Sequence, residues 1–127
     1  MNLLLSIILH TVFLQGLQSQ PVDTIYTHVD VMPEFKGGEA ALIKYIQKNM
    51  VYPAINRDED LGGKLVLRFV VNTDGTTSDF QMIKSVHPSI DNELIRVVKS
   101  AGNFNPGFKN GKPVRVYYNF PMTILLH

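Results

Sequence analysis

The sequence predicts an α+β domain, in which a small three-stranded antiparallel sheet has two helices packed on one of its faces. Two stretches carry apolar residues at the helical repeat, and three stretches alternate apolar and polar residues as half-buried strands do. Their order along the chain is helix, strand, strand, helix, strand. The chain has 127 residues, 45% of them hydrophobic, which suffices for one domain with its own core.

The first residues of the chain have the composition of an export signal. Residues 1–22 contain no Asp, Glu, Lys or Arg, and residues 3–14 are almost entirely apolar. An apolar stretch of about 12 residues is short for a membrane-spanning helix but fits the core of a signal peptide. Ser19 is small enough to precede a cleavage site. We therefore expect residues 1–19 to be a signal peptide, with a short membrane anchor as the alternative.

Residues 20–38 are expected to form an extended lead-in. Residues 22–32 mix apolar and polar side chains and fit either a short strand or an extended segment. Pro33 and the Gly37-Gly38 pair interrupt regular structure, so the lead-in ends in a P-E-F-K-G-G loop. The domain itself is expected over residues 39–127.

Residues 39–49 are predicted to form the first helix. Leu42, Ile46 and Met50, or alternatively Ile43 and Ile46, fall on one face at helical spacing, which gives this helix a side for the core. The Tyr52-Pro53 pair follows, and the residue before a proline is held in an extended conformation. The first helix therefore ends before this pair.

The clearest strand covers residues 64–72, where every second side chain is large and apolar: Leu65, Leu67, Phe69 and Val71. Its partner covers residues 77–85. The Asp74-Gly75 dipeptide between them readily adopts the positive φ that tight hairpin turns need. These two strands are therefore expected to form a hairpin.

The second helix is predicted to extend from Ile90, with Ser89 or Asp91 near its N-cap and with Gly102-Asn103 closing it. Its core face carries Leu94, Val97, Val98 and Ala101. A final strand covers residues 113–126. Pro121 lies inside this strand and, because proline cannot donate to a ladder of hydrogen bonds, it belongs at an edge or at a strand end.

Composition and motifs argue against several kinds of function. The net charge of +1 lacks the basic excess of nucleic-acid-binding proteins, and the absence of cysteine excludes a disulfide framework, a thiolate zinc site and a cysteine nucleophile. No two of the four histidines have the spacing of a helical metal pair. The glycine pairs do not fit a nucleotide-binding loop. We therefore expect no enzymatic activity, no cofactor, no metal and no nucleic-acid partner.

Several segments, taken in their order and spacing, resemble the TonB C-terminal domain family, in the variant that opens with a P-E-F-x-G-G loop. They are residues 33–38, 52–53, 62–71, 74–75, 104–107 and 111–114. The resemblance covers most of the chain after the N-terminal segment, and the fold that it implies agrees with the predicted order of helices and strands.

The resemblance implies a periplasmic protein of a Gram-negative cell envelope, acting in support of energy-dependent transmembrane transport. Its partner would be an outer-membrane TonB-dependent transporter, whose N-terminal TonB box is captured as an extended segment by strand addition to the sheet edge. Full-length members are anchored in the inner membrane and engage an ExbB–ExbD motor. That motor is implied here only if residues 1–19 remain as an anchor.

Carried over to this sequence, the resemblance places the partner-binding edge on the last strand and a neighbouring contact at the Tyr-Pro pair. The residues are Val114, Arg115, Val116, Tyr117, Tyr118, Asn119 and Phe120, with Val51, Tyr52 and Pro53. Two features depart from the family. Val51 stands where other members carry glutamine, and no long proline-rich linker precedes the domain.

An open strand edge also permits a different role. An edge strand carries unpaired N–H and C=O groups, which can pair with a second copy of the same chain. The alternative function is therefore a stand-alone envelope assembly module that forms a homodimer through its edge strand and has no role in transport.

Overall fold

The computed structural model describes residues 24–53 and 62–124. The signal peptide or anchor expected over residues 1–19 lies outside the described residues, and so do residues 20–23 of the lead-in. No helix within the described ranges is long and apolar enough to cross a membrane.

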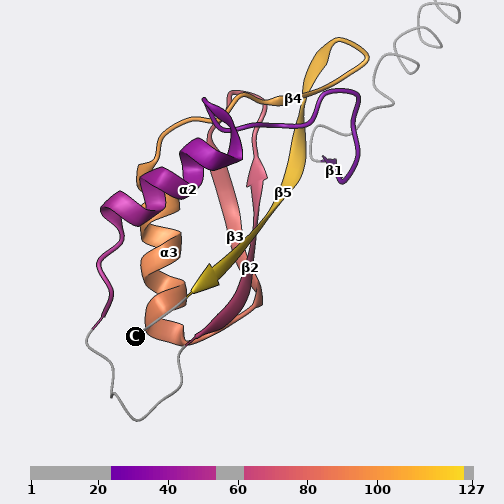
Figure 1. The fold of residues 1–127 in the computed structure, drawn as a ribbon. Helices are drawn as coiled ribbons and strands as arrows, with labels where there is room; N and C mark the ends of the chain where they lie inside the picture. The colour runs from indigo at the N-terminus through magenta and orange to yellow at the C-terminus, as the bar shows by residue number, and fades with distance from the viewer. Residues whose placement is uncertain (1–23, 54–61, 125–127) are drawn as a thin grey trace, which may run out of the picture.

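Three strands form the main part of the sheet (Figure 1): β2 (Gly63–Val71), β3 (Thr77–Lys84) and β5 (Lys112–Ile124). β2 lies in the middle and pairs antiparallel with both neighbours. The predicted alternation is confirmed, because the odd-numbered side chains from Leu65 to Val71 are buried in the core. The hairpin turn is confirmed as well. Asp74 accepts hydrogen bonds from the backbone N–H and the hydroxyl of Thr76, at 3.0 and 2.6 Å.

Two short strands enlarge the predicted three-stranded sheet to five strands. β1 (Ile25–Tyr26) pairs parallel with Arg115 and Val116 of β5, and β4 (Gly107–Lys109) forms a tight hairpin with the start of β5. The sheet order is β1-β5-β2-β3, with β4 beside β5. Strands of two and three residues are too short to show an alternating pattern, which is why only tertiary structure reveals β4 and decides between the two alternatives for β1.

The two helices, α2 (Gly38–Asn49) and α3 (Pro88–Ser100), lie on the same face of the sheet, as predicted (Figure 1). Each buries its apolar side there, with Leu42 and Ile46 from α2 and with Ile90, Leu94, Val97 and Val98 from α3. The α+β fold with two helices is thus confirmed.

The N-cap of α3 differs from the prediction. His87 occupies it, and its Nδ1 accepts the N–H of Ser89 at 3.1 Å. The helix begins at Pro88, a residue type that suits the first turn, and Ser89 therefore lies inside the helix. Asp91 is buried in the first turn and accepts hydrogen bonds from the Ser85 hydroxyl and the Val86 N–H.

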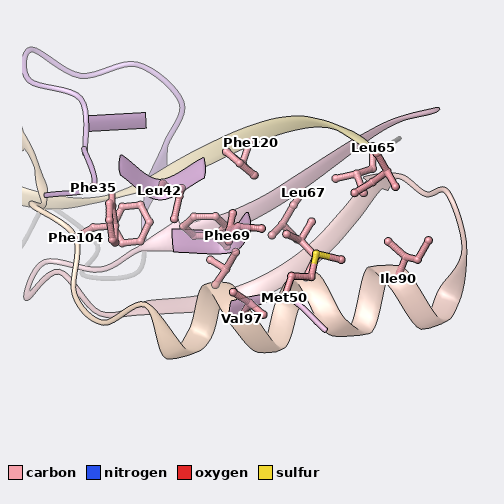
Figure 2. Packing of buried hydrophobic residues seen from close by; sticks show 14 of the residues in the cluster. Phe35, Leu42, Met50, Leu65, Leu67, Phe69, Ile90, Val97, Phe104 and Phe120 are labelled. Carbon is pink, nitrogen blue, oxygen red and sulfur yellow. The ribbon is translucent and has the colours of Figure 1, made fainter. Parts of the chain in front are cut away.

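The core runs between the sheet and the helices (Figure 2). Aromatic rings gather near the P-E-F-K-G-G loop, where the Phe104 ring meets Phe35 at 5.1 Å and Phe69 at 5.4 Å edge-on. Aliphatic side chains such as Leu65 and Ile90 fill the other end. The loop at residues 33–38 is therefore anchored in the core by Phe35.

The lead-in also pairs with the domain. Val31 and Glu34 form isolated bridges with Phe108 and Asn105, and the Asp30 carboxylate accepts the N–H of Asn110 at 2.8 Å. β4 is consequently held between the lead-in and β5. Described residues of the lead-in are thus part of the folded unit.

Candidate functional site

The backbone of β5 presents different groups on its two sides. In an antiparallel pair each residue directs its N–H and C=O to one side, and successive residues alternate. Pro121 is in register with Val66 of β2, and having no N–H it fits a position that faces away from β2. Alternation then directs the polar backbone groups of Tyr117 and Asn119 away from β2, and those of Tyr118 toward it.

The β4–β5 hairpin fits the same alternation, with β4 on the side of β5 that faces β2. Its two-residue turn, Asn110-Gly111, has positive φ at both positions, 53° and 75°. Such a turn is closed by a hydrogen-bonded pair, here Lys109 with Lys112. Even-numbered residues of β5 therefore face β4 and then β2, while odd-numbered residues face the opposite side, which we call the outer edge.

The outer edge of β5 is partly occupied. β1 is in register with Arg115 and Val116. From Tyr117 to Ile124 this side of β5 pairs with no strand among residues 24–53 and 62–124. The predicted open edge therefore exists in the described structure, but it begins after Val116.

Three of the predicted partner-binding residues turn their side chains into the molecule. Val116 and Phe120 are fully buried. The Tyr118 ring stacks on Phe69 at 5.1 Å and meets Phe104 edge-on at 5.4 Å. Burial raises the pKa of the Tyr118 hydroxyl, and the negative charges of Glu39 and Glu34 raise it further. Val116 and Phe120 therefore have only their backbone to offer a partner, whereas the side chain of Tyr118 is half-buried.

Arg115, Tyr117 and Asn119 lie on the opposite face of the sheet, away from the helices. The Arg68 guanidinium lies 4.4 Å from the centre of the Tyr117 ring and donates to Gln81 at 2.7 Å. Asn119 is exposed and stands opposite Arg68 in the register. A polar and cationic surface with one aromatic ring therefore borders the outer edge.

Arg115 is held on that face by two hydrogen bonds. Its Nε donates to the Asn72 side chain at 2.9 Å, and its Nη2 donates to the Asp79 carboxylate at 3.1 Å. Val114 is in register with Gly107 of β4. These two residues thus serve the fold of the sheet in the described structure.

The second part of the predicted site follows α2 in the chain. Val51 and Tyr52 are exposed, at 67% and 46%, while Met50 just before them is buried in the core. No hydrogen bond or ring contact within the described residues joins Val51, Tyr52 or Pro53 to β5. The structure therefore presents the Tyr-Pro pair as a separate apolar surface element.

The other edge of the sheet, β3, is irregular. Its pairing with β2 shifts register twice, and Asp79 adopts a positive φ of 54°. Bulges of this kind twist an edge and hinder pairing with another strand. Of the two long edges, the outer edge of β5 is the more regular.

Sequence reasoning missed Ile25 and Tyr26 as neighbours of the site and gave Pro121 no role in it. The signal for Pro121 was available, since the missing N–H marks where pairing on the outer edge must be interrupted. Over residues 24–53 and 62–124, no group of three His, Cys, Asp or Glu side chains is arranged to hold a metal ion.

Comparisons with known proteins agree on one family. The family model of the Gram-negative bacterial TonB protein C-terminal region matches residues 48–123, more than half of the chain. A solution structure of the Helicobacter pylori TonB C-terminal domain, residues 194–285, is similar with a TM-score of 0.50 at 20% identity. That match covers 68% of this chain and 90% of that one.

A longer fragment of the same H. pylori domain, residues 179–285, matches at 22% identity with a TM-score of 0.48, covering 72% of this chain and 86% of that one. No curated protein matches.

Proposed function

The chain belongs to the TonB C-terminal family, and we propose that it captures an extended segment of an outer-membrane transporter by strand addition to the outer edge of β5. The family is a periplasmic, non-enzymatic protein-binding domain whose members bind TonB-dependent transporters. Membership implies a TonB-like role in energy transduction to such transporters.

The open backbone beyond Val116 carries this proposal. Asn119 directs its polar backbone groups to a side of β5 that has no strand partner within the described residues, and Tyr117 directs its C=O there. A segment laid along this edge gains backbone hydrogen bonds that depend little on its sequence. Such tolerance suits a protein that serves transporters with different N-terminal segments.

Side chains that border the edge supply selectivity. A captured strand alternates its side chains between the two faces of the sheet. On the open face it meets Tyr117, which lies under the Arg68 guanidinium, and exposed Asn119. On the helix face it meets the half-buried Tyr118 and Met122. We expect the partner segment to place polar or acidic side chains on the first face and apolar ones on the second.

Asn119 offers a clean test, because a proline at this position removes an N–H from the outer edge and leaves the pairing with β2 intact. Asn119→Pro should abolish binding of a synthetic peptide that copies the N-terminal segment of a TonB-dependent transporter from the same cell. Asn119→Ala keeps the N–H and should weaken binding no more than about threefold. Isothermal titration calorimetry on the full chain measures both.

Equal effects of the two substitutions would contradict recognition through the backbone. Circular dichroism of both variants provides the folding control. A third variant, Ile83→Lys, changes an exposed side chain of the β3 edge and should leave peptide affinity unchanged. Loss of binding in Ile83→Lys but not in Asn119→Pro would move the site to the other side of the sheet.

The same open edge also supports the alternative of a homodimer through β5. Size-exclusion chromatography of the full chain, with and without the transporter peptide, separates the two functions. A monomer that binds peptide supports capture. A dimer whose elution volume is the same with and without the peptide supports the assembly role. Engagement of an ExbB–ExbD motor is proposed only for a chain in which residues 1–19 remain as an anchor.

A further inference from the structure

The geometry points to β1 as an internal occupant of the outer edge of β5. A partner segment must displace β1 before the segment can pair along the full length of this edge. This inference rests on the strand-addition function proposed above.

Pro121 sets one end. Because it has no N–H and faces outward, a captured strand finds an acceptor but no donor at this position. β1 sets the other end, since Ile25 and Tyr26 are already in register with Arg115 and Val116. Between them lie only residues 117–120, four positions.

Four positions make a short strand. Strands in globular proteins most often have about five or six residues. With β1 gone, the edge would extend from Arg115 to Phe120, which is six residues. Release of β1 would therefore bring the open part of the outer edge to the usual length of a strand and would expose the outward-facing backbone of Arg115.

β1 is held loosely enough to leave. It pairs over two residues, and both of its side chains are only partly buried. Outside the strand pairing, Tyr26 contributes a contact in which the Lys109 ammonium lies 4.5 Å from the centre of its ring. Segments with few buried contacts open at low free-energy cost while the rest of the domain stays folded.

The lead-in keeps its own attachment when β1 leaves. Asp30 accepts the N–H of Asn110, and Val31 pairs with Phe108 through two backbone hydrogen bonds of 3.1 and 2.8 Å. These contacts hold the chain just after β1, so the loop at residues 27–29 can act as a hinge. β1 can then swing away while the P-E-F-K-G-G loop remains packed on Phe104.

The tethered β1 competes with any partner through its high effective concentration, which is in the millimolar range for a short flexible link. A partner therefore sees only the fraction of molecules from which β1 is absent. If that fraction is about one tenth, the apparent affinity is about tenfold lower than the intrinsic one.

Tyr26→Pro tests this competition, because it removes an N–H from β1 and bends the segment, while Tyr26→Ala removes the side chain and keeps the N–H. Both are made in the full chain. The expected result is that Tyr26→Pro raises the affinity for the transporter peptide about tenfold, and that Tyr26→Ala raises it much less. Equal affinity of the wild type and Tyr26→Pro would overturn the inference while leaving strand capture intact. Weaker binding by Tyr26→Pro would also overturn it, since β1 would then be part of the binding surface.

A second probe separates this inference from the proposed function. A synthetic peptide with the sequence of residues 24–29, TIYTHV, is added at several millimolar, and the backbone amide signals of Tyr117, Tyr118 and Asn119 are followed by NMR. These signals should shift in Tyr26→Pro and stay unchanged in the wild type, whose own β1 fills the place. If the amide signals of Tyr26→Pro do not shift when the peptide is added, the inference is overturned. If TIYTHV binds Tyr26→Pro but no transporter peptide binds any variant, the edge accepts strands and the transporter function fails.

Discussion

Tyr118 joins the candidate edge to the core of the domain. Its backbone belongs to β5, while its ring stacks on Phe69 and touches Phe104. The same burial that packs the ring raises the pKa of its hydroxyl, with Glu39 and Glu34 adding to the shift. A single side chain therefore joins β5 to Phe69 of β2 and to Phe104 in the core.

The raised pKa of Tyr118 predicts a loss of stability in alkali. The unfolded chain loses this proton near its ordinary pKa of 10.0, whereas the folded chain retains it to higher pH. The contribution of Tyr118 is complete below pH 10 and declines as pH rises toward the folded-state pKa. Tyr118→Phe should match the wild type near pH 7 and lose less free energy of unfolding above pH 10. Urea denaturation between pH 7 and pH 11.5 measures the difference, and parallel pH curves for the two proteins would contradict it.

Gly75 shows what a single residue contributes to the turn. Its φ is 85°, and a Cβ at this position would stand 2.2 Å from the carbonyl oxygen of Phe104. The Gly75 carbonyl in turn accepts the N–H of Phe104 at 2.8 Å. The sequence identified Gly75 as a turn residue, but only the folded chain reveals that the turn also supports the aromatic end of the core.

At the scale of one element, the alternation along β5 decides which positions tolerate proline. Native Pro121 already occupies an outward-facing position. Asn119 shares that orientation, and Tyr118 faces β2 in register with Phe69. A proline at Tyr118 therefore removes a hydrogen bond from the centre of the sheet, whereas a proline at Asn119 removes none.

This contrast is testable by stability alone. Tyr118→Pro should be less stable than Tyr118→Ala by about 1–3 kcal/mol, whereas Asn119→Pro should lie within about 1 kcal/mol of Asn119→Ala. Comparing proline with alanine at each site cancels the loss of the side chain. Chemical denaturation monitored by circular dichroism gives the four values. A reversed order would show that the outer edge was assigned to the wrong side of β5.

β1 and β4 give β5 its asymmetry. β4 continues the pairing on the side of β2, and a Cβ on Gly107 would stand 2.7 Å from a methyl group of Val116, so the two strands approach closely. β1 covers the start of the other side. One strand is thus closed along one side and half open along the other.

At the scale of the whole molecule, the folded unit begins earlier than the sequence suggested. Because Ile25 is already in β1, only residues 20–24 separate a signal peptide or anchor from the first strand. Five residues span at most about 17 Å when fully extended. An uncleaved anchor would hold the domain close to the inner membrane, far from an outer-membrane transporter.

Export can be checked by mass. If residues 1–19 are a signal peptide, the protein recovered from the periplasm should begin at Gln20 and contain 108 of the 127 residues. Intact-mass spectrometry gives the answer directly, and fractionation shows whether the protein is in the soluble periplasm or in the inner membrane. A full-length mass in the membrane fraction would support the anchor and, with it, contact to an ExbB–ExbD motor.

The α+β class, the three long strands, the two helices with their buried faces and the Asp74-Gly75 hairpin turn could all be predicted from the amino-acid sequence. These features follow from local rules, because hydrophobic periodicity over eight or more residues reflects the two-sided environment of a helix or strand. The sequence also placed the candidate edge on the last strand through the family resemblance.

How much of that edge is open could be seen only in the folded chain. β1 and β4 contribute two and three residues, and their pairing joins positions 90 residues apart, such as Ile25 and Arg115, or depends on a close approach such as that of Gly107 to Val116. The His87 cap and the outward orientation of Pro121 likewise depend on where the chain begins a helix or meets a neighbour. Such contacts leave no periodic pattern in the sequence, since they arise from single residues brought together by the fold.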